Sequence, residues 1–446
     1  MTVDVVVVGA GASGLTAASD LAAAGFSVQV IEARDRIGGR IHTVPDRYGH
    51  PIEYGAEFVG PHQRTMLALA EQHGLRLAPT WDDGQHIGTF GGSERRWAGD
   101  LPGFGPRNLL GTAIGVGLLD TLARTVAPAT PWAGRLARRL DRRTVADWLR
   151  SAPLPGEASG LLEAAMRSIF AADMDEISLL HALMCIRSAG GFRRYIRSSG
   201  AQQLRFVDGA GALCERLMAT VPTPPILGVP VTAVADGSSG AVLTTETGTL
   251  RADRVVLAVP PRHAAAIAFD PPLPEGRSDH LRAARPGTVL KYHLAYDEPF
   301  WRAAGLSGKT ISNDALVNAT FDFSTGDQGV LAAFVVGGRA RRLLAENPQA
   351  RLDAVLADLA ERFGPAVRRP VDAAIHVWNE DPWSPGCFAG FQPPGSWTSS
   401  RSCPSRAHGR VHFAGTETAT RFHGAMEGAV SSGRRAAAEV AAALRR

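Results

Sequence analysis

The chain opens with an apolar run, a glycine-rich turn and a second apolar run. Residues 3–8 (VDVVVV) predict a parallel strand that is buried on both faces. A helical pattern extends from the turn at 9–14 to Ala24, and Ser27–Ile31 predicts the next strand. This order predicts a complete β-turn-α-β unit at the beginning of the chain.

Similar patterns recur far downstream. Residues 249–260 and 410–414 predict two more buried strands. The turn signal at 236–240 lies within a strand-rich section, 226–259, and predicts a hairpin. Helical patterns cover three stretches: 106–220, 351–364 and 433–446. The alternation of strands and helices indicates an α/β protein.

Composition narrows the classes of function. A chain of 446 residues that is 45% apolar suits two or three domain-sized units. Its 47 basic and 43 acidic residues leave a net charge of only +4, and two of the basic residues are lysine. The densest cluster of arginines, at 138–143, is typical of a solvated helix face, so we expect no nucleic-acid partner.

Cysteine usage and hydropathy indicate a soluble, cytoplasmic protein. None of the four cysteines forms a CxxC pair, which fits a reducing compartment and argues against a structural zinc site. The first strand begins at Val3 and leaves no room for a signal peptide. Residues 108–130 are apolar but carry Asp120 and Arg124, so we expect no membrane anchor.

The glycine-rich turn has the spacing of a dinucleotide site. Gly9 allows the tight turn, Gly11 lets the backbone approach a diphosphate, and Gly14 lets helix and strand pack closely. The diphosphate would meet the free amides and positive dipole end of the helix. Glu32 ends the second strand, where a carboxylate accepts ribose hydroxyls and disfavours the 2′-phosphate of NADP. The segment Arg36–Arg40 suits a second phosphate or a flavin, but by itself leaves FAD, NAD and a plain surface turn open.

Taken together, these residues and several later motifs resemble the flavin-dependent amine oxidases. The motifs that carry the resemblance are Gly9–Gly14, Glu32, Arg36–Arg40, Gly287–Lys291, Pro299–Trp301, Trp378, Ser384–Phe388, Phe413–Thr420 and Gly424–Val430. The matches run through most of the chain and are weakest over 75–160. The long C-terminal motif makes the resemblance specific.

The resemblance implies a Rossmann-like FAD-binding domain interleaved with an α+β substrate domain. The FAD-binding domain would comprise residues 1–75, 205–286 and 395–446, and the substrate domain residues 76–204 and 287–394. The flavin ring would lie at their junction. Whether the chain forms a homodimer is left open.

The family's cofactor contacts can be carried over residue by residue. They would be made by Gly9, Gly11, Gly14, Glu32, Arg34, Gly39, Arg40, Gly55, Ala56, Glu57, Val231, Trp378, Cys387, Gly415, Glu417 and Met426. By this resemblance, Val231 would contact the adenine through its backbone. Met426 would donate its amide near the pyrimidine end of the flavin, where the helix dipole favours negative charge.

Two residues carry the chemistry that the resemblance implies. Lys291 lies in an apolar strand-like run, where a charge is costly unless it is used; in the family this lysine holds a water against flavin N5. The alternative is an edge-strand lysine that reaches solvent. Cys387 matches the cysteine that monoamine oxidases link covalently to the flavin, or it is an ordinary buried thiol. Pro385 stands where those enzymes usually have glycine, which leaves the linkage open.

The expected amine site departs from the monoamine oxidase pattern. Phe388 and Ala425 occupy the positions of two opposed tyrosines, so half of that aromatic cage is missing and a bulkier substrate fits. Glu57 would steer a cationic amine, unless backbone amides or an arginine satisfy it. Tyr195 and Gln202 match positions that line the substrate pocket, although an exposed loop tyrosine is equally ordinary.

The hypothesis is therefore a FAD-dependent oxidase that moves a hydride equivalent from an amine C–N bond to flavin N5. The products would be an imine and, after reoxidation by O2, hydrogen peroxide. Three alternatives remain: a biosynthetic oxidase of an amine or amide in a larger natural product, a same-fold enzyme that oxidises C–C bonds, and a flavin-binding protein without catalysis. A plain NAD dehydrogenase is a fourth.

Overall fold

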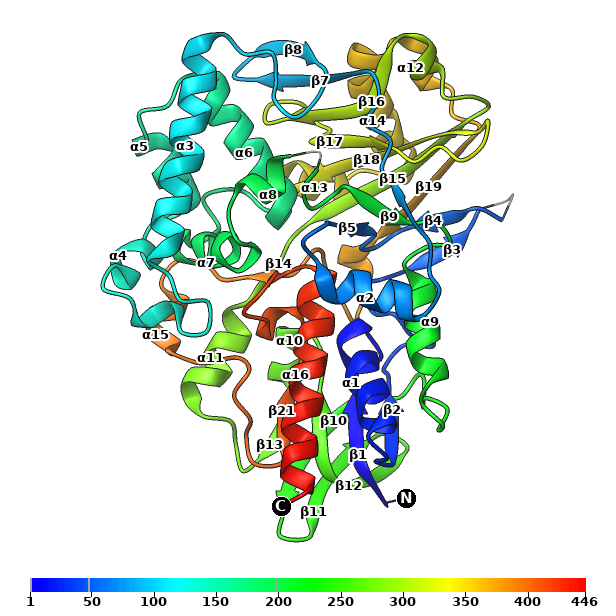
Figure 1. The fold of residues 1–446 in the computed structure, drawn as a ribbon, viewed down its shortest axis with the longest axis vertical. Coiled ribbons are helices and arrows are strands. Elements are labelled where there is room, and N and C mark those ends of the chain that lie inside the picture. Colours follow the sequence, from blue (N-terminus) through cyan, green and yellow to red (C-terminus); the bar gives the residue numbers. More distant parts are fainter. Residues whose placement is uncertain (1, 47–48, 198) are drawn as a thin grey trace.

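Two seven-stranded sheets occupy opposite ends of the molecule, and a block of helices lies beside the upper one (Figure 1). The computed structural model describes residues 2–46, 49–197 and 199–446. Both chain termini lie at the end that holds the first sheet (Figure 1). The junction of the two halves is where the sequence motifs converge.

The first sheet joins segments from the start, middle and end of the chain. Its order is β13-β10-β11-β12-β1-β2, and β21 pairs with β12. The strands are β1 (Thr2–Val8), β2 (Val28–Ile31), β10 (Val231–Gly237), β11 (Gly240–Thr245), β12 (Gly248–Leu257), β13 (Ala268–Asp270) and β21 (Val411–Phe413). Val5, Val6 and Val7 of β1 are fully buried, as expected for a parallel strand covered on both faces.

The second sheet comes from the later part of the chain, apart from one hairpin. Its order is β19-β15-β18-β17-β16-β7-β8. The strands are β7 (Gln85–Phe90), β8 (Ser93–Trp97), β15 (Val289–Tyr296), β16 (Leu306–Ser312), β17 (Ala319–Asp322), β18 (Gly329–Val336) and β19 (Asp372–Val377). Smaller sheets contain β3 (Thr43–Pro45) and β4 (Pro51–Glu53), β5 (Phe58–Val59), β6 (Leu77–Pro79) and β9 (Leu204–Phe206), and β14 (Arg285–Pro286) and β20 (Gly390–Phe391).

Helices cover both sheets, and no described helix is long and apolar enough to cross a bilayer. They are α1 (Ala12–Ala23), α2 (Arg64–Gln72), α3 (Pro106–Arg124), α4 (Ala137–Asp141), α5 (Val145–Ser151), α6 (Gly156–Phe170), α7 (Leu179–Ala189), α8 (Arg193–Ile196), α9 (Gly211–Ala219), α10 (Pro261–Ala266), α11 (Glu275–Ala283), α12 (Phe300–Ala303), α13 (Gly337–Leu344), α14 (Pro348–Phe363), α15 (Ser396–Ser400) and α16 (Met426–Leu444). Short 3-10 turns add η1 (Pro131–Ala133), η2 (Pro365–Arg368), η3 (Trp378–Glu380) and η4 (Thr416–Thr418).

The C-terminal helix is longer than the sequence pattern predicted. It begins at Met426 rather than at Gly433. Gly433 lies inside the helix, at its contact with α1, and does not mark the helix start. A Cβ on Gly433 would lie 2.2 Å from the carbonyl oxygen of Ser13, so only glycine lets the two helices approach this closely. The strand predicted over 249–260 likewise ends at Leu257, just before the two prolines at 260–261.

Candidate active site

An elongated cavity of about 380 Å³ runs past the ends of the central strands of the first sheet. Val8 ends β1, Ile31 ends β2 and Ala258 follows β12, and all three line it. Ligands of α/β sheets bind at this edge, outside the carboxyl ends of the strands. The cavity is therefore where the sequence predicts the cofactor.

Two helix N-termini border this cavity. Helix α1 begins after Gly11 and α16 begins after Ala425, and no side chain caps either helix. Gly11, Ala12, Ala425 and Met426 all line the cavity. The uncapped amides and the two dipoles favour negative charge there, as a diphosphate or an anionic ring supplies.

The glycines of the turn have the conformations that the motif requires. Gly9 has φ +102°, and a Cβ there would lie 2.7 Å from the carbonyl oxygen of Ala258. A Cβ on Gly14 would lie 2.0 Å from the carbonyl oxygen of Gly9, so Gly14 allows the close packing of α1 on β1 without lining the cavity. A Cβ on Gly11 would meet only Gly38 O, at 3.9 Å, which leaves open space for a ligand.

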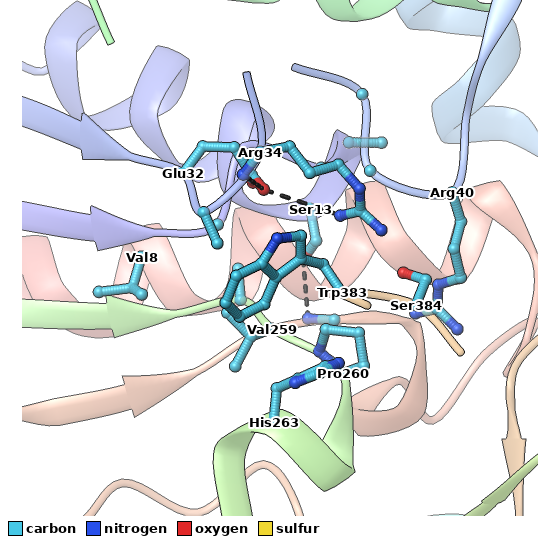
Figure 2. Close-up of a pocket in the computed structure, with 18 of the residues that line it drawn as sticks. Val8, Ser13, Glu32, Arg34, Arg40, Val259, Pro260, His263, Trp383 and Ser384 are labelled. Atoms are coloured by element: carbon cyan, nitrogen blue, oxygen red, sulfur yellow. Dashed lines mark hydrogen bonds and ion pairs between the residues drawn. The ribbon is translucent and has the colours of Figure 1, made fainter. Parts of the chain in front are cut away.

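Glu32 and Arg34 stand at one end of the cavity, opposite Val259, Pro260 and His263 (Figure 2). The Glu32 carboxylate accepts hydrogen bonds from the backbone amides of Ala10 (2.7 Å) and Arg34 (2.9 Å). These bonds fix the carboxylate and leave each oxygen a free lone pair for a ribose hydroxyl. Val231 lines the same cavity.

Arg40 connects the two ends of the chain at the other end of the cavity. It forms a two-pronged ion pair with Glu417 (2.6 and 2.9 Å) and also donates to the carbonyl oxygen of Phe388. Burial by itself would raise the pKa of Glu417, but the Arg40 guanidinium outweighs it and holds the pKa at about 2. Gly39, Arg40 and Gly415 line the cavity, whereas Glu417 stands behind Arg40 and does not.

A second cavity, of about 260 Å³, lies on the side of the second sheet and the helical block. It shares five wall residues with the first: Ala56, Phe388, Gly424, Ala425 and Met426. Phe321, Phe334 and Ile169 are among its apolar lining residues. The structure thus brings Phe388 and Ala425, the expected cage positions, to the shared wall.

Lys291 and Glu57 form a buried ion pair beside that wall. Lys291 Nζ lies 2.8 Å from Glu57 Oε1 and 3.2 Å from the carbonyl oxygen of Gly55. Strand β15 pairs with β18 and β19, and Lys291 is 3% exposed, which excludes the solvent-exposed edge lysine. Lys291 lines neither cavity directly, whereas its partners Gly55 and Glu57 line the second one.

Burial raises the pKa of Glu57 to about 7, against the opposing charge of Lys291. Its Oε2 atom is buried and has no partner among the described residues. Among the residues that the structure describes, the side chain of Lys291 hydrogen-bonds this carboxylate and no arginine or backbone amide does. Glu57 is therefore a buried carboxyl group with a raised pKa and one unpartnered oxygen, on the wall of the second cavity.

Tyr195 and Gln202, the two residues expected in a substrate pocket, both line the second cavity. Tyr195 belongs to the short helix α8 and is half-buried, so it is no exposed loop residue. Burial raises the pKa of its hydroxyl, which stays protonated and can donate.

A group of polar side chains that the sequence analysis did not single out adjoins the same wall. Ligand-type atoms of His181, Cys185 and His423 lie within 4.8 Å of one another. Trp397 Nε1 donates to His181 Nδ1 (3.4 Å), which places the proton of the neutral ring on Nε2, 3.7 Å from Cys185 Sγ. A metal-binding histidine instead gives its second N–H to an acceptor, so the geometry is that of a hydrogen-bonded cluster.

Trp378 is one of the predicted cofactor residues that do not line the first cavity. Its side chain is fully buried, donates to the carbonyl oxygen of Tyr54 (2.9 Å) and lines neither cavity. Trp383 lines the first cavity instead (Figure 2). The 3-10 turn η3 (Trp378–Glu380) separates the two tryptophans along the chain, and the cofactor contact of Trp378 stays a prediction.

Cys387 lines the first cavity, near Arg40 and Phe388. Its thiol is buried, and burial raises its pKa to about 12. Ser13 was missed by the sequence analysis: its hydroxyl accepts from the amide of Gly415 (2.8 Å) and so ties the C-terminal motif to α1. Its place inside the glycine-rich turn was the available signal.

Comparison with known proteins places these features in context. Residues 12–441 match the profile of the flavin containing amine oxidoreductase family. AofH of Mycobacterium tuberculosis, a protein assigned to the flavin-containing monoamine oxidases, is 37% identical over 99% of this chain and 97% of its own length. Cyclohexylamine oxidase from Brevibacterium oxydans superposes with a TM-score of 0.94 at 31% identity, over 100% of both chains. Putrescine oxidase bound to putrescine gives 0.93 at 30% identity, over 99% of both chains.

Proposed function

Because the chain belongs to the flavin-containing amine oxidoreductases, which act on amine carbon–nitrogen bonds with FAD, we propose that its first cavity holds FAD and its second the amine. The observation that carries this assignment is the wall that the two cavities share. When bound, FAD would supply the chemistry of a two-electron oxidation of the amine carbon–nitrogen bond, with an imine as the product and with O2, reduced to hydrogen peroxide, as the final acceptor.

The chain's residues fit FAD along the whole first cavity. Glu32 and Val231 would hold the ribose and adenine end, and the amides at the start of α1 would hold the diphosphate. Arg40 would lie toward the ring end. The amide of Met426 and the dipole of α16 would face the ring and favour its reduced, negatively charged form.

Glu57 would accept the proton that the amine must lose before oxidation. Amines are ammonium ions at neutral pH, and a carboxyl with a pKa of about 7 is the group on the cavity wall that is matched to this exchange. Lys291 would hold Glu57 in position and keep a fraction of it ionised. The proton then resides on Glu57 while the neutral amine lies next to the shared wall.

The second cavity favours amines with a bulky apolar substituent. Its lining combines Phe321, Phe334 and Ile169 with Phe388 at the wall, and Ala425 leaves open the space that a tyrosine would fill. The lost tyrosine also favours an amine group carried by a larger natural product. Tyr195 and Gln202 would contact the substrate's distal polar groups.

The experiment that tests the function uses the purified protein and a panel of amines. We expect a flavin spectrum, bleaching of that spectrum by an amine without O2, and hydrogen peroxide when O2 is admitted. Arylalkyl and cycloalkyl amines should bleach the flavin spectrum faster than short alkylamines. A colourless protein, or a flavin that no amine reduces, would contradict the proposal; reduction by a C–C substrate alone would favour a desaturase-type enzyme.

A covalent bond between FAD and Cys387 is a further part of the proposal, supported by the position of the thiol on the cavity wall. Yellow colour should stay with acid-precipitated protein and be lost in Cys387→Ala. The matched control is Cys403→Ala, since Cys403 is partly exposed and lines no part of the first cavity. The domain boundaries, a cytoplasmic location and a homodimer stay predictions.

A further inference from the structure

Helix α3 is apolar on the face that it exposes as well as on the face that it buries. Its buried face packs on α6 and α7, and a Cβ on Gly115 would lie 2.5 Å from the Leu162 side chain. On the opposite side, Leu110, Ile114 and Leu118 are 63%, 42% and 39% exposed. A spacing of four residues puts these three side chains in one stripe along the helix.

The exposed stripe is part of a concentration of apolar side chains. Nine large apolar side chains are exposed among the described residues, and six of them fall within residues 101–136: Leu101, Leu109, Leu110, Ile114, Leu118 and Leu136. Scattered exposed leucines are ordinary, but a helix that is apolar on all sides belongs in a core or against an apolar partner. We therefore expect the stripe to contact an apolar partner.

The exposed charged side chains within residues 105–143 are all arginines. Six arginines are exposed on α3, on α4 and in the adjoining turns: Arg107, Arg124, Arg135, Arg138, Arg139 and Arg142. No ion pair is found for any of them among the described residues. The two acids in this stretch are engaged elsewhere: Asp120 accepts from the amide of Phe192, and Asp141 is buried with Ser178 and Thr398.

Helix α3, which carries the apolar stripe, and helix α4, which carries or adjoins three of the arginines, both pack on one hydrophobic cluster. Figure 1 shows α3 and α4 along the same outer edge of the helical block, with α4 beside the C-terminal end of α3. The apolar stretch at 108–130 and the arginine cluster at 138–143, which look unrelated in the sequence, thus belong to helices that share one hydrophobic cluster.

We propose that this α3–α4 surface docks on an anionic lipid bilayer. Leucine and isoleucine side chains would enter the headgroup boundary, and the arginines would meet lipid phosphates while their aliphatic stems cover apolar area. A second copy of the chain fits less well, because a symmetric contact would bring two arginine clusters together without acids to neutralise them. The proposal is independent of the amine chemistry.

Vesicle binding by the flavin-loaded protein tests the proposal. We expect the wild type to co-float with phosphatidylcholine vesicles that contain phosphatidylglycerol, to remain free with phosphatidylcholine alone, and to be released by high salt. Leu110→Ser/Ile114→Ser/Leu118→Ser and, separately, Arg138→Ala/Arg139→Ala should each weaken partitioning roughly tenfold or more. Both variants should keep the wild-type rate of amine oxidation, which shows that they fold.

Matched controls separate the α3–α4 surface from general charge and hydrophobicity. Leu227→Ser/Val371→Ser removes two exposed apolar side chains elsewhere, and Arg445→Ala/Arg446→Ala removes two exposed arginines at the C-terminus. Both should bind vesicles like the wild type. The proposal is overturned if the wild type ignores anionic vesicles at low salt, if the serine variant binds as well as the wild type, or if that variant only converts a dimer into a monomer.

Discussion

Replacement of Lys291 by methionine should move the pH at which the enzyme becomes active. The expected catalytic carboxylate, Glu57, loses in this variant the positive charge that lies 2.8 Å from its Oε1 atom. Methionine keeps most of the volume of the lysine side chain, so the packing of β15 between β18 and β19 is preserved. The change is therefore mainly electrostatic.

The size of the effect follows from the geometry of the pair. At an effective dielectric constant of ~20, two unit charges ~2.8 Å apart attract by about 6 kcal/mol, which is an upper bound. Measured effects of a nearby opposite charge move a carboxyl pKa by roughly 1–3 units, because the site relaxes. Burial already raises the pKa of Glu57 to about 7. In Lys291→Met we expect it at roughly 8–10.

The sign is fixed by the role of Glu57 as a base. Only the ionised carboxylate accepts a proton, so the second-order rate of flavin reduction by amine should rise with pH through about 7 in the wild type. In Lys291→Met the pH at which this rate rises should be higher by roughly 1–3 units. Stopped-flow measurement of flavin bleaching without O2, across pH and with one amine, gives both profiles.

Two further variants make this result decisive. Lys309→Met removes the chain's other lysine, which pairs with Asp82, and should leave the rise where it is in the wild type. Glu57→Gln should abolish the rise and leave only the ionisation of the amine itself. The reasoning is refuted if the rate of flavin reduction in Glu57→Gln still rises with pH as in the wild type. It is also refuted if Lys291→Met slows the reaction without shifting the pH at which the rate rises.

Three other changes test separate parts of the site. Glu417→Gln breaks the ion pair with Arg40. Because the pKa of Glu417 is about 2 in the folded protein against an ordinary 4.5, the pair contributes about 3 kcal/mol of stability above pH 4.5, and this contribution is lost as the pH falls toward 2. Acid unfolding of the variant, monitored by circular dichroism, should therefore lack this loss of stability between pH 4.5 and 2. Gly14→Ala places a Cβ 2.0 Å from the carbonyl oxygen of Gly9 and should yield protein with little bound flavin, which the ratio of visible to ultraviolet absorbance reports; full flavin content would contradict the packing argument. Ala425→Tyr fills the shared wall and should lower kcat/KM at least about tenfold for bulky amines while sparing small ones, and an equal loss for both would show that the wall does not select by size.

The sequence by itself determined the cofactor half of this protein. The turn Gly9–Gly14 and the acid Glu32 are local signals, because strand, turn and helix follow each other directly along the chain. Two element boundaries differ from the sequence pattern: β12 ends at Leu257 and α16 begins at Met426. Both differences are local. A glycine inside a helix reads as a break until the neighbouring helix that needs it is visible.

Only the tertiary structure decided how the amine half is built. Lys291 and Glu57 are far apart in sequence, and nothing in either segment specifies that a buried carboxyl and a buried ammonium form one pair. The same holds for Trp383, which lines the first cavity where Trp378 does not, and for the packing of α3 and α4 on one hydrophobic cluster. Burial, and with it the pKa of a side chain, depends on neighbours from distant segments, so residue type and spacing name the candidates while long-range packing chooses among them.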